Sequence, residues 1–209
     1  MPTVLVTGFE PFGDEQENPS ARAAELAAAE LARAGFDARS AVLPVSFKRC
    51  GEALAQLLER LKPGVAVALG LAGGITHVRL ERVAINLADA SRPDNDGAQP
   101  VDEPIDPQGP AAYFSTLPLR RILERLKGEG VPAAISNSAG TFLCNYAMYL
   151  LLRHADLHGY PRRAGFIHLP YTPEIAVRKP GPPPSLPLSL QVKAIVVAVE
   201  EAAALLADA

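Results

Sequence analysis

The feature that most constrains the fold of this chain is a regular alternation of short apolar runs with segments of helical spacing. The apolar runs lie at residues 4–7, 38–45 and 65–69, and the helical segments between them at 21–34 and 46–61. Apolar runs of this length, without a polar residue at every second position, are typical of strands buried on both faces of a sheet. The order strand, helix, strand, helix, strand therefore predicts a parallel sheet with helices on both sides.

The residues at the ends of the two helical segments support these boundaries. Asn18 precedes Pro19, which is the usual order of an N-cap and a first helical residue, and Gly35 follows the alanine-rich run. Ser46 is placed to cap the second segment, which Pro63 would end. Both segments are therefore predicted to be helices.

The same alternation returns in the second half of the chain, after a long polar excursion at residues 88–110. Loops of that length in a compact domain are usually functional. We predict, in order, helix 119–126, strand 133–136, helix 145–154, strand 165–170, a proline-rich surface segment at 170–187 and a final helix from Ser189.

Length and composition indicate one domain, residues 1–209. With 48% hydrophobic residues, the 209-residue chain can bury a substantial single core. The net charge is -3 and no basic run carries interleaved aromatic residues, so a nucleic-acid partner is not expected. The chain starts without a basic region and has no apolar run of the ~20 residues that a membrane helix needs. We therefore expect a cytoplasmic protein with no membrane partner.

The chain has two cysteines, and one of them stands where a helix is predicted to start. The absence of a Cys-x-x-Cys pair and of a His-Glu-x-x-His motif argues against a disulfide framework and a metal site. The heptapeptide from Gly140 to Tyr146 leaves a predicted strand and enters a predicted helix, with Cys144 at the junction. Unpaired amide groups and the helix dipole favour a thiolate at such a position. Cys144 is therefore a candidate nucleophile, whereas we interpret Cys50 as a small buried core residue.

A thiolate nucleophile requires an imidazole that exchanges protons with it. Of the four histidines, His154 and His158 lie in or beyond the helix that starts near Cys144, ~15 Å or more along its axis, and we expect them to be solvated. His168 ends a predicted strand of the same sheet, at the edge where Cys144 emerges, because catalytic groups of open α/β sheets gather outside the carboxyl ends of the strands. His168 is therefore preferred to His77, which follows a glycine-rich loop.

The imidazole in turn requires an acceptor that orients its second nitrogen. Glu81 lies among apolar neighbours, where a carboxylate needs a partner, and is the best candidate for this role. An ion pair of Glu81 with Arg79 or Arg82 is the alternative. The spacing alone therefore does not decide between a triad of Glu81, Cys144 and His168 and an ion pair of Glu81 with a neighbouring arginine.

Five sequence blocks, spread in order over nearly the whole chain, carry a resemblance to a known family. They are Gly8-Phe-Glu-Pro-Phe-Gly13 with Asn18-Pro19-Ser20, Glu81-Arg-Val-Ala-Ile-Asn86, Pro93-Asp-Asn95 with Gln99-Pro100, Ala139-Gly-Thr-Phe142 with Cys144-Asn145, and Gly165-Phe-Ile-His168-Leu-Pro-Tyr171. Taken together, these blocks resemble the type I pyroglutamyl peptidases. Five ordered blocks are far more specific than any single cysteine.

The resemblance implies a cytoplasmic, cofactor-free cysteine peptidase that removes N-terminal pyroglutamate from peptides through a thioester. The implied fold is α/β, a single-domain three-layer α/β/α sandwich with a mostly parallel twisted sheet, and the implied assembly is a homotetramer. The family's catalytic Glu, Cys and His fall on Glu81, Cys144 and His168. Its aromatic pocket walls match Phe9, Phe12 and Phe142, and we also assign Asn18, Leu71 and Leu143 to the substrate pocket.

Two positions depart from the family pattern. Where the family has Ala-Arg-x-Pro-Asp-Asn, this chain reads Ala90-Ser91-Arg92-Pro93, so the arginine of the oxyanion region is displaced by one position, to Arg92. Leu71 replaces the usual Gln. Two alternative functions stay open: a cysteine amidase that acts on other small lactams or amides, and a catalytically impaired binding protein of the same fold.

Overall fold

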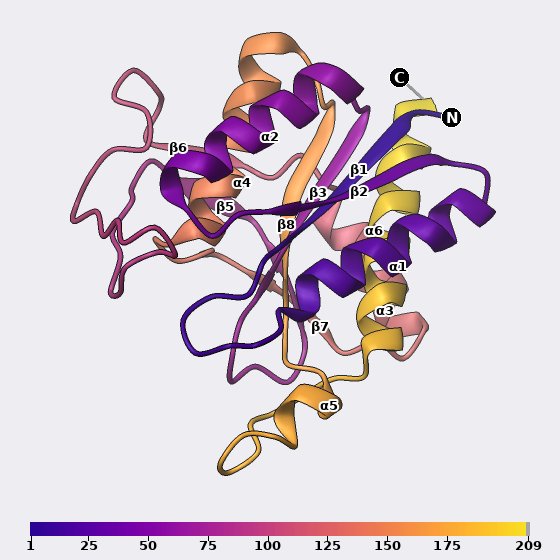
Figure 1. Ribbon diagram of the computed structural model, residues 1–209. Coiled ribbons are helices and arrows are strands. Elements are labelled where there is room, and N and C mark those ends of the chain that lie inside the picture. Colours follow the sequence, from indigo (N-terminus) through magenta and orange to yellow (C-terminus); the bar gives the residue numbers. More distant parts are fainter. Residues whose placement is uncertain (208–209) are drawn as a thin grey trace.

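Residues 1–207, the part of the chain that the computed structural model describes, form a sheet with helices on both sides (Figure 1). The strands of the sheet are β1 (Thr3–Phe9), β2 (Asp37–Leu43), β3 (Val65–Leu71), β4 (Val78–Glu81), β7 (Ala133–Ser136) and β8 (Arg163–Leu169). The helices are α1 (Pro19–Arg33), α2 (Phe47–Leu61), α3 (Leu119–Gly128), α4 (Leu143–His158), α5 (Pro173–Ala176) and α6 (Leu188–Ala207). A separate antiparallel pair consists of β5 (Val83–Ile85) and β6 (Ala112–Phe114). The predicted three-layer α/β fold is confirmed.

The helix starts are those that the sequence predicts. Asn18 is the extended N-cap of α1, and its Oδ1 accepts a hydrogen bond from the Ser20 amide at 3.1 Å. Ser46 caps α2 in the same way, accepting from the Arg49 amide at 3.1 Å. Gly35, just past α1, has a φ of +91°, a left-handed conformation that favours glycine. Local side-chain chemistry therefore sets both boundaries.

The two faces of the sheet pack against different helices, because alternate side chains of a strand point to opposite faces. Val4 and Val6 of β1 belong to a core shared with α1, α3 and α6. Leu5 and Phe9 of the same strand belong to a second core, shared with α2 and α4. Figure 1 shows these two helical layers on either side of the sheet. Several of the residues predicted to be functional belong to the α2 and α4 side: Phe9, Phe12, Phe142, Leu143 and Cys144.

The directions of the strands differ from the expectation in one respect that matters for the site. The strand order is β2-β1-β3-β8-β4-β7, and β8 pairs parallel with β3 but antiparallel with β4. Since β7 is parallel to β4, the strand that precedes Cys144 runs opposite to the strand that carries His168. The expectation that the two residues meet because their strands end at one edge of the sheet is therefore wrong.

Cys144 and His168 meet for a different reason. Helix α4 begins at Leu143 and is joined by the short connection 159–162 to β8, so the helix runs antiparallel to the strand. The start of the helix therefore lies at the carboxyl end of β8, where His168 is the last residue but one. The loop 137–142 carries the chain from the end of β7 to this position.

Three smaller details also differ from the expectations. The predicted strand 65–69 extends to Leu71. The segment 78–86, between this strand and the polar excursion, forms two strands, β4 and β5, which belong to different sheets. The surface segment 170–187 contains the short helix α5, whose first residue is Pro173.

Candidate active site

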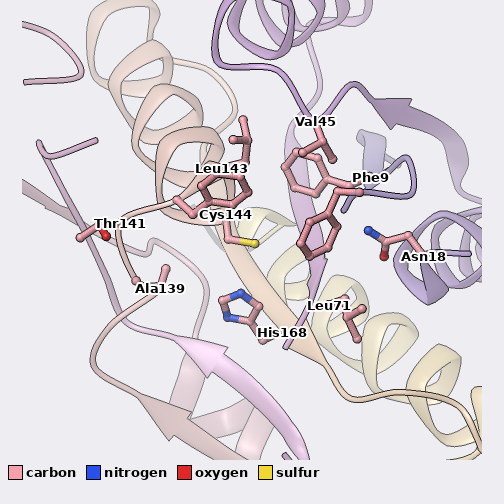
Figure 2. A pocket seen from close by; sticks show the side chains of 12 residues that line it. Phe9, Asn18, Val45, Leu71, Ala139, Thr141, Leu143, Cys144 and His168 are labelled. Atoms are coloured by element: carbon pink, nitrogen blue, oxygen red, sulfur yellow. The ribbon is translucent and has the colours of Figure 1, made fainter. Parts of the chain in front are cut away.

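Cys144 and His168 line one cavity of about 210 Å³ at the carboxyl end of β8. Figure 2 shows that the two side chains, from α4 and β8, project into the same space, with Phe9 and Asn18 across from them. All six residues predicted for the substrate pocket line this cavity as well: Phe9, Phe12, Asn18, Leu71, Phe142 and Leu143. Segments that are far apart in the sequence therefore converge on the cysteine.

Glu81 lies behind the histidine and not in the cavity wall. Its Oε1 accepts a hydrogen bond from Nδ1 of His168 at 2.8 Å, and its side chain is completely buried. The antiparallel register places Arg79 opposite His168, so Glu81, two residues further along β4, is a diagonal neighbour on the same face of the sheet. This contact fixes the imidazole so that Nε2 is the nitrogen left to face the cavity.

The surroundings of His168 favour its charged form. Burial lowers the pKa of this imidazole, but the charge and hydrogen bonding of Cys144, followed by those of Glu81, outweigh burial and raise the pKa to about 9. At neutral pH the ring is therefore an imidazolium between a carboxylate and a sulfur. An imidazolium beside a thiol stabilises the thiolate, which is the nucleophilic form of cysteine.

The loop before Cys144 is fixed by two hydrogen bonds to a single residue. Thr141 donates from Oγ1 to the Asp89 carbonyl at 2.7 Å, and the Asp89 amide donates to the Thr141 carbonyl at 3.0 Å. Gly140 adopts a φ of +78°, which turns the chain toward α4. Phe142 is the extended N-cap of that helix and supplies no side-chain cap. The first amides of α4 are therefore available to a group in the cavity.

Aromatic rings form the apolar wall of the cavity. The Phe12 ring lies 6.3 Å from the Phe142 ring, and Phe47 packs edge-on against Phe142 at 5.5 Å and 87°. Both distances are in the range of favourable aromatic pairs. Phe142 is thereby held between the loop after β1 and the first turn of α2. The other residues of the wall add no carboxylate and no amine to it.

Asn18 has a structural role as well as a place in the cavity wall. Its Oδ1 accepts from the amide and the hydroxyl of Ser20, and its Nδ2 donates to the Glu10 carbonyl at 3.1 Å. An amide group offers two donor hydrogens. One N–H of Asn18 is therefore free to bind a ligand in the cavity.

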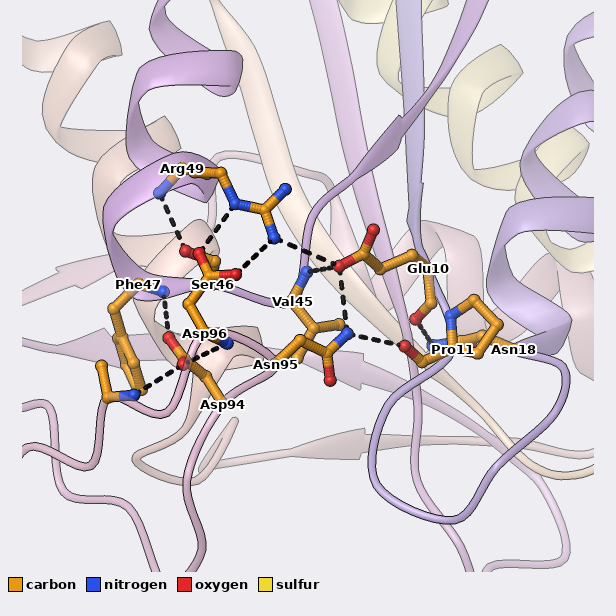
Figure 3. Close-up of polar contacts among 11 residues, drawn as sticks. Glu10, Pro11, Asn18, Val45, Ser46, Phe47, Arg49, Asp94, Asn95 and Asp96 are labelled. Carbon is orange, nitrogen blue, oxygen red and sulfur yellow. Dashed lines mark hydrogen bonds and ion pairs between the residues drawn. The ribbon is translucent and has the colours of Figure 1, made fainter.

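A polar network outside the cavity holds the loop that follows Phe9 and carries Phe12 (Figure 3). Asn95 donates from Nδ2 to Glu10 Oε1 at 3.0 Å and to the Pro11 carbonyl at 2.9 Å. The same Glu10 oxygen accepts from the Val45 amide at 3.0 Å. The polar excursion, residues 88–110, thus anchors one wall of the cavity.

The sequence analysis did not identify four residues of the cavity wall. Val45, Ala139, Gly140 and Thr141 line the cavity, and the last three belong to a block that the resemblance had already singled out. Val45 had no sequence signal, because it follows β2 as an ordinary apolar residue. Arg92 lies outside this cavity: its guanidinium is 5.9 Å from the centre of the Phe12 ring, in a neighbouring cavity.

The other histidines and cysteine lie elsewhere. His77 forms a contact with its neighbour Thr76 and does not line the cavity. The expectation that His154 is solvated is wrong, since the ring is half-buried, with its centre 4.3 Å from that of His158, and burial lowers its pKa. Cys50 is completely buried, as predicted, and burial raises its pKa to about 12.

Three further observations concern residues 1–207. Within this part of the chain, no three His, Cys, Asp or Glu side chains are grouped so that they could hold a metal ion. None of its helices is both long and apolar enough to cross a membrane. Both cysteines are free.

Comparison with known proteins gives consistent matches over the whole chain. A family model described as pyroglutamyl peptidase matches residues 2–205. The chain is 48% identical over 203 residues to the pyrrolidone-carboxylate peptidase of Pyrococcus furiosus, covering 95% of this chain and 97% of that one. It is 50% identical over 200 residues to the enzyme of that name from Chromobacterium violaceum, covering 96% and 92%. A crystal structure of pyrrolidone carboxyl peptidase from Pyrococcus furiosus superposes with a TM-score of 0.91 at 46% identity, covering 98% and 99%.

Proposed function

The chain belongs to the pyroglutamyl peptidase family of cysteine peptidases, and on that premise we propose that Cys144, His168 and Glu81 are its catalytic triad. The substrates are peptides with an N-terminal pyroglutamate. The observation that carries the assignment is the continuous contact from the Glu81 carboxylate through the His168 ring to the cavity that holds Cys144. No cofactor takes part in this reaction scheme.

The reaction proceeds through two proton transfers at one imidazole. The Cys144 thiolate attacks the carbonyl carbon that joins pyroglutamate to the next residue, and the His168 imidazolium protonates the departing amine. A thioester remains on the sulfur. Water then attacks the thioester, His168 accepts a proton from the water, and free pyroglutamate leaves. Glu81 keeps the ring in the required orientation throughout.

The oxyanion of each tetrahedral intermediate is stabilised by backbone amides at the start of α4. Amides of the first helical turn have no partner within the helix and carry the positive end of its dipole. The amide of Cys144 belongs to this turn, as does that of Leu143. Donors that are already oriented toward the developing charge stabilise it without further rearrangement.

The composition of the cavity wall explains selection for a blocked N-terminus. Pyroglutamate is a neutral lactam and fits a wall made of Phe9, Phe12, Phe142 and Leu71. An ordinary N-terminal ammonium would lose its water and find no carboxylate in this wall. Leaving a buried charge without a partner costs far more than losing one hydrogen bond. Peptides with a free N-terminus are therefore rejected.

Release of product from a pyroglutamyl anilide, with a free glutaminyl anilide as the comparison, tests the assignment. We expect release from the first substrate only, and almost none after Cys144→Ala. Cys50→Ala, the matched change at the other cysteine, should leave the catalytic thiol in place. Release that is unchanged in Cys144→Ala would exclude Cys144 as the nucleophile.

A series of pyroglutamyl amides with increasingly long leaving groups separates a peptidase from an amidase. A peptidase should gain kcat/KM as the leaving group becomes more like a peptide, whereas an amidase specific for small lactams should not. A thiol that reacts with iodoacetamide only at high pH would favour the catalytically impaired binding protein.

We also propose that the enzyme is a cytoplasmic homotetramer, as the family resemblance implies. Two large apolar side chains, Val101 at 67% and Phe114 at 69%, are exposed in the monomer, and subunit contacts would remove them from water. Sedimentation equilibrium at micromolar concentration measures the mass directly. A monomeric mass would contradict the proposed assembly.

A further inference from the structure

A second cavity adjoins the one that holds Cys144. It has a volume of about 420 Å³ and shares two wall residues, Phe12 and Leu71, with the first cavity. The Phe12 ring separates the two spaces, with Phe142 near it in the first cavity and Arg92 near it in the second. The two cavities are therefore neighbours that have Phe12 and Leu71 in common.

The second cavity lies close to the end of β8, beside His168. Leu71 at the end of β3 pairs with Leu169 of β8, the residue that follows His168. Tyr171, two residues later, lines the second cavity. Figure 2 shows Leu71 beside His168, on the opposite side of the imidazole from Ala139 and Thr141. Because His168 is the proposed donor to the departing amine, the leaving residue would start beside this histidine, next to the second cavity.

Some of the charged side chains in the second cavity have partners within the protein and others do not. The Glu15 carboxylate accepts from Lys179 Nζ at 2.7 Å with both oxygens, and from the Tyr171 hydroxyl at 2.6 Å. These three groups satisfy one another. Arg92 and Asp14 also line the cavity, are exposed, and form no ion pair with any residue in the range 1–207. They are the two charges that a ligand could use.

We propose that the second cavity binds the first residue of the leaving peptide and that Arg92 recognises a carboxylate on this residue. The carboxylate is either an acidic side chain or the free C-terminus of a pyroglutamyl dipeptide. A guanidinium binds carboxylates through its planar set of donors, and Arg92 is already oriented by the face of Phe12. Asp14, in the same cavity, repels such a group. This proposal rests on the proposed peptidase activity and specifies the substrates that it favours.

Three matched substrates test the proposal by steady-state kinetics. They are pyroglutamyl-alanine amide, which is neutral, pyroglutamyl-alanine, which has a free carboxylate, and pyroglutamyl-glutamate α-amide, which has an acidic side chain. We expect Arg92→Ala to raise KM about three- to fivefold for a substrate with a carboxylate, with a smaller change for the neutral amide. Asp14→Asn should lower KM for the same substrates. The substrate whose KM rises more in Arg92→Ala identifies which of the two carboxylates Arg92 binds.

Two further variants complete the experiment. Arg92→Lys keeps the charge and should retain part of the preference for a substrate with a carboxylate. Arg120→Ala, which removes an exposed arginine of α3, should leave KM unchanged for all three substrates. An equal loss of kcat for all three substrates in Arg92→Ala would overturn the proposal in favour of an oxyanion role for this arginine. Equal KM values in Arg92→Ala and the wild type would also overturn it. If the wild type does not cleave the neutral amide, the peptidase assignment itself fails.

Discussion

Gly70 lies directly under the sulfur of Cys144. A Cβ added to this residue of β3 would come within 2.7 Å of the Cys144 sulfur and 2.8 Å of the Phe166 ring. Real Cβ atoms essentially never approach other atoms so closely, so the sulfur needs a residue without a side chain beneath it. The pairing of Gly70 with His168 across β3 and β8 places this bare backbone next to the imidazole. The position of the proposed nucleophile therefore depends on a glycine that has no side chain to take part in the chemistry.

We expect Gly70→Ala to reduce kcat/KM by about 100-fold or more, because a displacement of the nucleophile by about 1 Å is enough to lose that factor. The melting temperature checks that the variant still folds. Gly128→Ala is the matched control, since a Cβ there meets nothing within 4 Å. Full activity in Gly70→Ala would show that the sulfur can move without loss.

Glu81→Gln keeps the shape of the side chain and removes its charge. The charge and hydrogen bond of Glu81 help to raise the pKa of His168, so this pKa should fall in the variant. By analogy with the loss of the carboxylate in other triads, we expect kcat/KM to fall by about two to four orders of magnitude. Glu25→Gln, an exposed residue that pairs with Arg22, is the control. A loss of less than threefold would contradict the orienting role of Glu81.

The activity should depend on pH through His168. Protonation of the leaving amine requires the imidazolium, so kcat/KM should fall on the alkaline side with a pKa near 9. Glu81→Gln should move this alkaline limb to lower pH. An alkaline limb that is unchanged in Glu81→Gln would assign the titration to another group.

The stability of the fold should follow the same titration. The pKa of His168 is raised in the folded state, so the proton is bound more tightly there than in the unfolded chain. The resulting stabilisation is fully present below about pH 6.5, which is the ordinary pKa of histidine, and is lost as the pH rises to about 9. We expect the free energy of unfolding in urea to fall by a few kcal/mol over this interval. Cys144→Ser, which removes a cause of the raised pKa, should show a smaller fall.

Asn95 should affect substrate binding more than catalysis. Its side chain donates to Glu10 and Pro11, which position Phe9 and Phe12. Since each lost hydrogen bond costs about 1 kcal/mol, we expect Asn95→Ala to raise KM about fivefold or more with a smaller change in kcat. Asn95→Asp should be worse, because it places a carboxylate against Glu10. Rescue of Asn95→Asp by Glu10→Gln checks the cause, and failure of this rescue would contradict it.

The sequence was sufficient for the features that depend on neighbouring residues. The caps at Asn18 and Ser46 follow from side-chain chemistry within one helical turn, and the structure has both. The position of Cys144 near the start of a helix is a feature of the same kind. The preference for His168 over His77 rests on a geometric reason that the direction of β7 contradicts, whereas the resemblance points to His168 independently.

The features that could not be predicted depend on pairings across long distances in the chain. The insertion of β8 between β3 and β4 reverses β4 and β7, and the sequence of β7 contains nothing that specifies this direction. The contact of Asn95 with Glu10 joins residues 85 positions apart. Val45 lies in the cavity wall, where its amide donates to Glu10, 35 positions away. Side-chain preferences act locally and do not determine such partners.

The central place of β8 has a consequence for the synthesis of the protein. β8 is the last strand to leave the ribosome, yet it joins β3 to β4 in the middle of the sheet. A nascent chain that ends before Arg163 has two partial sheets with unpaired edges and has no His168 beside its thiol. The same strand that completes the sheet also carries His168, the proposed base. On the proposed catalytic triad, we expect a growing chain to be unable to cleave peptides until β8 has joined the sheet.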